Sequence, residues 1–326
     1  MRQKIRSCPG YVILKFFSML LGLSLFGTAL TSLSLGQMHY AEGGFQPGAA
    51  GWLLQNLNAS GETFSEGQNV LAGDGDDTVN ILLIGQDRRE NEGRTRSDTM
   101  ILCSFNKRTK KLTMASFLRD LYVPIPGYGS DRLNSAYVFG GMELLDRTIE
   151  EDFGVRVDGN VEVDFSQFTQ VVDTLGGVEL DIRADEAEVI NFEAGSNISA
   201  GVNRLNGLQA LAYARIRKLD ADGDFSRTSR QRKVLDALLT AYRSASIPTM
   251  LALTTKILPM ITTDMTPLEI VGHSMAIFPY LSSAEVVSLH IPVSGTFSDQ
   301  NIDGMAVLVP DLSANRDILR EALAEN

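Results

Sequence analysis

Short apolar runs alternate with amphipathic segments along most of this 326-residue chain. Runs of β-branched and aliphatic residues bounded by glycine or polar residues predict buried strands, whereas apolar residues that recur every three or four positions predict helices. The first pattern predicts strands at residues 79–85, 99–106, 112–118, 161–165, 178–182, 213–217 and 286–291. The second predicts helices at residues 134–153, 165–175, 205–212, 226–244, 247–258, 267–280 and 315–324.

These strands and helices interleave from residue 79 to residue 326 without a second linker. The polar residues 107–111 separate two apolar strands and predict a hairpin between them. Interleaved strands and helices are typical of α/β folds. We therefore expect one α/β domain over 79–326, with a mixed central β-sheet flanked by helices on both faces.

The N-terminal region has a different pattern. Residues 16–41 contain no Asp, Glu, Lys or Arg, and the most apolar part has about the ~20 residues that a bilayer core requires. Basic residues precede this run, which predicts a cytoplasmic tail at 1–15 and a transmembrane signal anchor at 16–37, with the domain outside the cell membrane. A cleaved signal peptide is the alternative, but its apolar region is usually shorter.

Residues 38–78 are rich in Gly, Ser, Asn, Asp and Ala and show no hydrophobic period, so we expect a flexible extracellular linker.

The charge balance excludes one class of function. The formal net charge is −11, and four of the cations precede the predicted anchor, so the domain itself is more acidic still. Nucleic-acid affinity depends mainly on cations that neutralise phosphates, so we expect no nucleic-acid partner. Two cysteines are too few for a disulfide-rich scaffold, and three histidines without clustered Cys/His spacing do not indicate a zinc enzyme.

Two aspartates lie at the ends of neighbouring predicted strands. Asp87 follows the first strand and Asp98 directly precedes the second. Read alone, Asp87 is more typical of a turn cap than of a ligand site. Two carboxylates at adjacent strand ends, with no His or Cys nearby, suit Mg²⁺, which usually takes one or two carboxylates and completes its shell with water and phosphate.

Arginines are the candidates for binding an anion. On the predicted strand at 213–217, Arg215 and Arg217 are two residues apart, so they are expected to share one face. Arg227, Arg230 and Gln231 are expected to share one face of the following helix. Arg119 closes a strand and Arg132 directly precedes a helix. Surface salt bridges would explain any one of these arginines, but the guanidinium fork also matches phosphate oxygens, and together they indicate an anion site.

The chain resembles the LytR-CpsA-Psr family of cell-envelope glycopolymer transferases. The resemblance runs from about residue 79 to about 245 and includes the segments at 80–87, 96–100, 117–120, 132–137, 163–165, 176–178, 205–207, 213–217 and 224–231. The chain departs from the family pattern at Leu118, Arg132 and Ser226, where proline, lysine and glycine are common.

The resemblance implies a reaction. Such proteins move an anionic glycopolymer, such as teichoic acid or capsular polysaccharide, from a polyprenyl-pyrophosphate carrier to a peptidoglycan hydroxyl, which forms a phosphodiester. By position, Asp87 and Asp98 would hold Mg²⁺. The residues that would bind the pyrophosphate, with Arg96 and Arg132 in support, are Arg119, Arg215, Arg217, Arg227 and Gln231.

Roles within the site stay open at this stage. Phosphoryl-transfer enzymes act mainly by stabilising charge, so the catalytic candidates are Arg119 and Arg227 together with a general base, which could be Asp98, Asp120 or Asp224. Two alternative functions remain. One is a hydrolase of polyprenyl pyrophosphate that uses water as the acceptor. The other is a membrane-tethered regulator without enzymatic activity, as the family's older label of transcriptional attenuator suggests.

Overall fold

The computed structural model describes residues 39–40, 77–86, 95–220, 222–277, 280 and 283–324. The predicted anchor at 16–37, most of the predicted linker at 38–78, and Asp87 lie outside these residues. Among the helices in the described ranges, none is both long and apolar enough to cross a bilayer.

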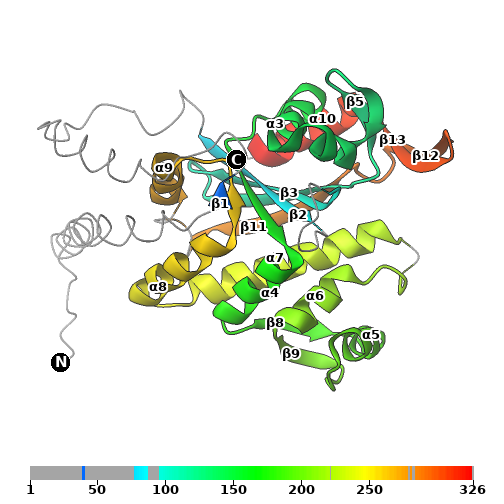
Figure 1. Cartoon of the computed structure of the whole chain (residues 1–326). Coiled ribbons are helices and arrows are strands. Elements are labelled where there is room, and N and C mark those ends of the chain that lie inside the picture. The colour runs from blue at the N-terminus through cyan, green and yellow to red at the C-terminus, as the bar shows by residue number, and fades with distance from the viewer. Residues whose placement is uncertain are drawn as a thin grey trace, which may run out of the picture.

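A mixed sheet forms the centre of the molecule (Figure 1). Its strand order is β1-β10-β7-β2-β3-β4-β11. The antiparallel pairs are β10–β7, β2–β3 and β3–β4, and the parallel pairs are β1–β10, β2–β7 and β4–β11. The strands are β1 (His39–Tyr40), β2 (Thr78–Gln86), β3 (Ser97–Asn106), β4 (Lys111–Phe117), β7 (Gly159–Asp164), β10 (Thr262–Thr263) and β11 (Glu285–Ile291).

Helices cover the sheet, with α3 and α10 on one side and α7 on the other (Figure 1). The helices are α3 (Leu133–Phe153), α4 (Phe165–Thr174), α5 (Ala184–Ala194), α6 (Gly207–Arg215), α7 (Asp224–Arg243), α8 (Ile247–Ile257), α9 (Pro267–Ile277), α10 (Leu312–Ala324) and the short 3₁₀ helix η2 (Leu258–Met260). Three two-stranded antiparallel ribbons complete the fold: β5 (Tyr122–Ile125) with β6 (Gly129–Arg132), β8 (Val178–Ile182) with β9 (Gly201–Leu205), and β12 (Phe297–Ile302) with β13 (Met305–Pro310).

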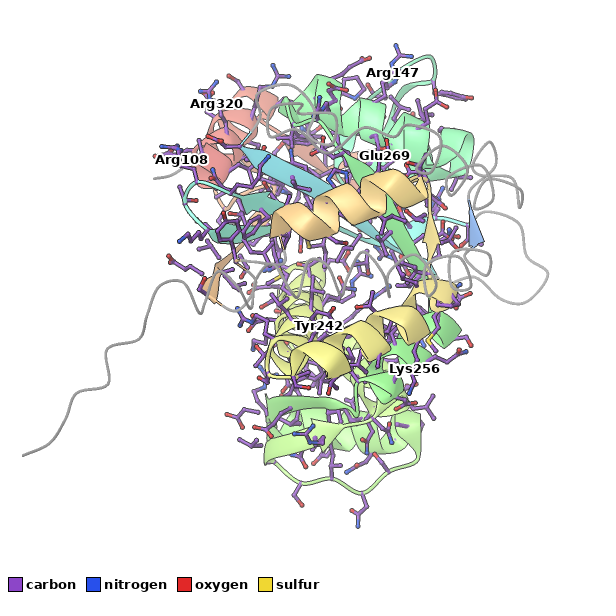
Figure 2. The ribbon with its side chains drawn as sticks, turned by 90° about the vertical axis from the view of Figure 1, so that its left-hand side faces the viewer. Arg108, Arg147, Tyr242, Lys256, Glu269 and Arg320 are labelled. Atoms are coloured by element: carbon purple, nitrogen blue, oxygen red, sulfur yellow. The ribbon has the colours of Figure 1, made fainter. Side chains whose placement is uncertain are left out.

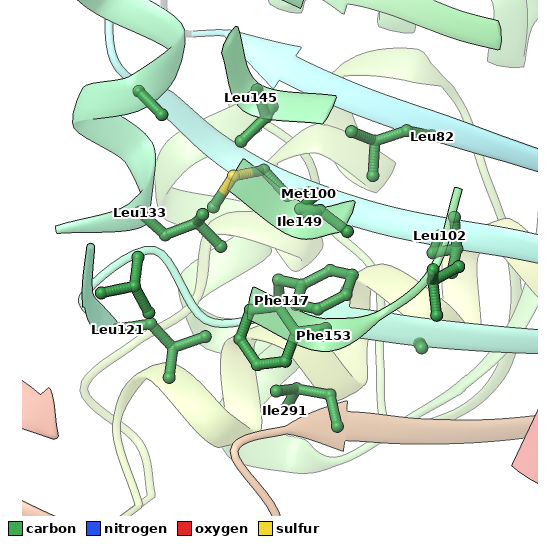
Figure 3. Packing of buried hydrophobic residues seen from close by; sticks show 14 of the residues in the cluster. Leu82, Met100, Leu102, Phe117, Leu121, Leu133, Leu145, Ile149, Phe153 and Ile291 are labelled. Carbon is green, nitrogen blue, oxygen red and sulfur yellow. The ribbon is translucent and has the colours of Figure 1, made fainter. Parts of the chain in front are cut away.

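The main hydrophobic core lies between the sheet and α3 (Figure 3). Leu82 and Met100 from the strands meet Leu145 and Ile149 from the helix, and all four are buried. The apolar residues of α3 recur at helical spacing, so burying one stripe of the helix against the sheet removes that surface from water.

A second core lies in a lobe below the sheet, built from α4, β8, α5, β9, α6 and α7. Figure 2 shows this lobe at the bottom, with Tyr242 of α7 and Lys256 of α8 labelled between it and the sheet. Helices α4 and α6 approach closely at Gly207, where an added Cβ would lie 2.3 Å from the Thr169 carbonyl oxygen. The lobe therefore sets the position of α6 and of the residues that follow it.

Most predicted strands and helices are confirmed within a few residues at each end, including the β3–β4 hairpin, and so is an α/β fold with a mixed central sheet. The prediction of a strand at 213–217 was wrong. Helix α6 continues through Arg215, because Asn206 and Gln209 form a capping box at its start and its residues are strong helix formers. Of the six strands in the three ribbons, only β8 was predicted. Strands β5, β6, β9, β12 and β13 and helix α5 were not.

Candidate active site

One edge of the sheet gathers the predicted site. Strand β3 runs antiparallel to both β2 and β4, so the start of β3 lies beside the ends of its neighbours: Ser97 pairs with Gln86, and Ile101 pairs with Ser116. Asp98, near the start of β3, therefore lies close to Arg119, which follows β4. Ligands of open α/β sheets often bind where the carboxyl ends of strands meet.

Arg119 joins two carboxylates from distant parts of the chain. Its Nη1 donates to Asp98 Oδ1 at 2.7 Å, and its Nε donates to Asp224 Oδ2 at 3.1 Å. Burial lowers the pKa of Arg119, but Asp224, Asp98 and Asp120 outweigh that effect, so the pKa is raised overall. Arg119 is therefore a fixed cation at the sheet edge.

Arg227, on the first turn of α7, contacts the same two aspartates. Its Nη2 donates to Asp224 Oδ2 at 2.8 Å and to the backbone oxygen of Asp98 at 3.1 Å. The residue is only 1% exposed, and within the described part of the chain its Nε and Nη1 atoms have no hydrogen-bond partner. Buried donors without partners cost free energy, so this guanidinium retains capacity for an anionic acceptor.

Burial, with help from the neighbouring cations Arg119 and Arg217, lowers the pKa of Arg227 to about 10, although Asp224 opposes this shift. Arg227 still carries a full charge at neutral pH. The repulsion from its neighbours is itself a reason for this site to favour an anion, because bound negative charge would offset the crowding of cations.

Two more arginines lie beside aspartates at this edge of the sheet. Arg217 Nη2 lies 3.4 Å from Asp98 Oδ2. Arg132 Nε lies 3.3 Å from Asp120 Oδ1, and its Nη2 donates to the Ala306 carbonyl. The residues that the structure brings together, which we call the arginine cluster, are Asp98, Arg119, Asp120, Arg132, Arg217, Asp224 and Arg227.

Arg215 and Arg217 do not share a face, as the predicted strand required. Arg215 is the last residue of α6, and its guanidinium lies over the Phe165 ring, 4.6 Å from the ring centroid. Arg217 follows the end of α6 and turns towards Asp98. The two side chains separate because the helix ends between them. Arg96, another candidate, lies just before β3 and is exposed.

Arg230 is also placed elsewhere than the helical spacing predicted. It does not accompany Arg227: its Nε donates to Glu186 Oε1 at 2.9 Å, and its Nη2 pairs with Asp220. Both carboxylates lie in the lower lobe or in the α6–α7 connection. Gln231 is half-buried, and within the described residues its Oε1 atom has no hydrogen-bond partner.

A buried polar chain supports the same sheet edge, and the sequence pattern did not single it out. Gln86 Nε2 donates to Tyr137 Oη at 2.7 Å, and Tyr137 Oη donates to Glu162. Gln86 Oε1 in turn accepts from Thr95, at 3.1 Å from its hydroxyl. These hydrogen bonds hold the end of β2 beside the residues that lead into β3. A polar Gln at the end of an apolar strand was the signal available in the sequence.

The residues present can be tested against a magnesium ion. The described ranges hold no group of three or more His, Cys, Asp or Glu side chains that could bind a metal. Asp98 is about one-quarter exposed, and its Oδ2 is only loosely held by Arg217 at 3.4 Å, so that oxygen can accept a further bond. One carboxylate fits Mg²⁺ where phosphate oxygens and water, with or without a second carboxylate, complete the shell.

The fold defines an α/β protein with a cluster of arginines and aspartates at one edge of its mixed sheet. The chain matches the LytR_cpsA_psr family over residues 54–322 and belongs to that family. Among curated relatives, the regulatory protein MsrR of Staphylococcus aureus strain COL is 31% identical over 255 residues, which cover 77% of this chain and 76% of MsrR.

A second curated relative carries an enzymatic name. The polyisoprenyl-teichoic acid–peptidoglycan teichoic acid transferase TagT of Bacillus subtilis strain 168 is 39% identical over 182 residues, which cover 53% of this chain and 56% of TagT.

Solved structures with bound lipid share the fold. TagT bound to LIIa-WTA has a TM-score of 0.63 and 30% identity, and the match covers 81% of this chain and 98% of that one. The protein YwtF (TagT) with bound octaprenyl pyrophosphate has a TM-score of 0.59 and 27% identity, over 80% of this chain and 94% of that one.

Proposed function

We propose that this protein transfers an anionic glycopolymer from a polyprenyl-pyrophosphate carrier to a hydroxyl group of peptidoglycan. The arginine cluster carries this proposal, above all Arg227, whose buried guanidinium has two nitrogen atoms that find no partner among the described residues. A pyrophosphate offers several acceptor oxygens, and its negative charge complements a cluster in which four arginines outnumber three aspartates. The likeness to a structure with bound octaprenyl pyrophosphate supports the same ligand class.

The chemistry follows from the charges. The acceptor hydroxyl attacks the phosphorus that carries the glycan, a new P–O bond forms, and the bond to the bridging oxygen breaks, so that polyprenyl phosphate leaves. Negative charge grows on the leaving phosphate, and Arg119, Arg217 and Arg227 stabilise it. The hydroxyl proton passes to a carboxylate, for which Asp98, Asp120 and Asp224 are the candidates in the cluster.

Magnesium belongs to the proposal. Asp98 would contribute one ligand and Asp87 the second, and the pyrophosphate oxygens and water would complete the shell. The ion would neutralise charge on the phosphates and lower the barrier to their separation. Arg96, Arg215, Arg230 and Gln231 are proposed as further residues that support the substrate, directly or through their neighbours.

We place the reaction at the outer face of the cell membrane. The predicted anchor at 16–37 would tether the chain, with its N-terminus in the cytoplasm and its domain outside, where lipid carrier and peptidoglycan meet. Hydrolysis of the pyrophosphate by water would use the same residues. The other alternative is a regulator that binds the lipid without transferring the glycan. This alternative is retained because the relative MsrR is named a regulatory protein.

Product analysis separates these functions. The purified protein would be incubated with a lipid-linked anionic glycan, Mg²⁺ and peptidoglycan, and both products would be measured by mass spectrometry. A transferase attaches the glycan to peptidoglycan and releases polyprenyl phosphate in equal amounts. A hydrolase releases polyprenyl phosphate at the same rate without peptidoglycan. A regulator retains the lipid and consumes none of it, and either of these last results would refute the proposal.

A further inference from the structure

Arg230 is buried near the start of α7, as Arg227 is, but the hydrogen bonds that its guanidinium makes to described residues go to Glu186, Ile216 and Asp220, outside the arginine cluster. Only 3% of the residue is exposed. A buried arginine needs several partners to offset its loss of hydration, and the identity of those partners shows what the side chain holds in place.

Its partners lie on both sides of Arg217. Arg230 Nη1 donates to the backbone oxygen of Ile216 at 3.4 Å, and Arg230 Nη2 pairs with the Asp220 carboxylate. Ile216 directly precedes Arg217, and Asp220 follows it by three residues. One guanidinium therefore holds the short connection between α6 and α7 at two points that flank Arg217.

The arginine is itself anchored in the lower lobe. Its Nε donates to Glu186 Oε1 at 2.9 Å, and Glu186 is only 4% exposed. Glu186 lies in the first turn of α5, where its carboxylate also accepts from the backbone N–H of Arg183 at 3.0 Å. Arg183 Nη1 adds a second contact to Asp220 at 3.0 Å. The Asp220 carboxylate is thus held by two cations, which together lower its pKa.

Arg217 itself has little else to fix it. Its side chain is 42% exposed, and its contact with Asp98 is long, at 3.4 Å. A side chain this exposed is placed by its backbone, and its backbone lies between the two points that Arg230 holds. Substrate-binding groups need such support to stay in a productive position.

We propose that Arg230, with Glu186 and Asp220, is a positioning residue that holds the α6–α7 connection so that Arg217 faces the arginine cluster. Arg230 then does not touch the pyrophosphate; it acts through Arg217. This inference rests on the proposed function only for the identity of the ligand, because the clamp itself is measurable without any ligand.

The first experiment measures amide hydrogen exchange of residues 216–223 in the full-length protein. Asp220→Asn removes one arm of the clamp and leaves the buried Arg230–Glu186 pair intact, so the variant is expected to fold. Loss of a charge-assisted hydrogen bond predicts exchange about tenfold faster in this segment. Arg230→Gln predicts a larger increase.

Arg232→Gln is the matched control, since Arg232 is also buried on α7 but donates to Ser116 of β4 instead. It is expected to leave exchange of residues 216–223 within about twofold of the unchanged protein. Unchanged exchange in Asp220→Asn and Arg230→Gln would overturn the proposal.

The second experiment tests action through Arg217, with octaprenyl pyrophosphate as the probe. Arg230→Gln is expected to weaken binding about tenfold when it is the only change. Added to Arg217→Ala, it is expected to weaken binding by less than about twofold. A merely structural role would weaken binding equally in both backgrounds and would overturn the inference. Failure of the unchanged protein to bind the probe would refute the proposed function instead, while the exchange experiment would still decide the clamp.

Discussion

Single arginines of this protein differ more in their partners than in their sequence context. Arg217, Arg227 and Arg230 lie within fourteen residues of one another. Arg217 is exposed, Arg227 is buried within the arginine cluster, and Arg230 is buried against the α6–α7 connection. Residue type and spacing predicted an anion site but not this division of roles, because partners such as Glu186 and Asp98 come from distant parts of the chain.

Asp98 is where the magnesium proposal is most open to test. Asp98→Asn keeps the size of the side chain and an acceptor oxygen but removes the charge that would bind the ion. We expect the rate of glycan transfer at limiting Mg²⁺ to fall about tenfold or more and to recover partly as Mg²⁺ is raised. Transfer rates would be measured across a magnesium titration. An unchanged magnesium dependence would contradict this role of Asp98.

Asp146 of α3 predicts a pH dependence of stability. Burial, opposed by a hydrogen bond from Asn160 and assisted by nearby Asp264 and Glu150, raises the pKa of Asp146 to about 7. The folded state therefore holds a proton that the unfolded state releases near pH 4. This contribution to stability is full below about pH 4, decreases as the pH rises, and is lost once the pH passes the folded-state pKa of about 7.

Asp146→Asn should remove that loss, because an amide does not ionise. Its oxygen can still accept the hydrogen bond from Asn160. We expect the variant to be more stable than the unchanged protein at pH 8, on the order of 2 kcal/mol, and to show a much smaller difference at pH 5. Urea unfolding at the two pH values measures this. Glu143→Gln, which removes an exposed carboxylate from the same helix, is the control. Equal effects at both pH values would show that Asp146 is not the group responsible.

The elements of the fold were largely predictable, and the exceptions have local causes. Apolar runs and helical periods located β2, β3, β4 and α3 because each buries a regular face against the main core. The residues at 213–217 failed because an alternation of arginines with apolar residues imitates a strand, while the capping box that sets the helix begins seven residues earlier. The ribbon β5–β6 and helix α5 are short or weakly amphipathic and depend on tertiary contacts.

The close contact of α4 with α6 gives a prediction about stability. An alanine Cβ at position 207 would meet backbone atoms of Thr169 at 2.3 and 2.7 Å, and backbone cannot move aside without shifting a whole helix. Gly207→Ala should lower the free energy of unfolding by roughly 2 kcal/mol or more.

Gly195→Ala provides the comparison, since Gly195 has a positive φ of +60° but open space around it, and its cost should be about 1 kcal/mol. Chemical denaturation of both variants measures the difference. A smaller cost for Gly207→Ala than for Gly195→Ala would contradict the close packing.

The whole molecule joins an acidic body to a sheet edge where four arginines gather. Sheet order brings Asp98 and Arg119 together, the lower lobe presents Arg217, and the start of α7 adds Arg227 and Asp224. No local pattern could supply this arrangement, because it depends on which strands are neighbours and where two helices end. In a chain with a net charge of −11, this gathering of arginines is a local departure that favours an anion.

Titration of octaprenyl pyrophosphate against variants of Arg227 tests the central claim most directly. A lysine keeps the charge but offers a single ammonium in place of the guanidinium fork, so Arg227→Lys should weaken binding about tenfold or more, nearly as much as Arg227→Ala. Arg232→Lys, at a buried position on the same helix, should change binding by less than about twofold. Binding by folded Arg227→Lys and Arg227→Ala proteins as tight as that of the unchanged protein would contradict the claim that the arginine cluster is the pyrophosphate site.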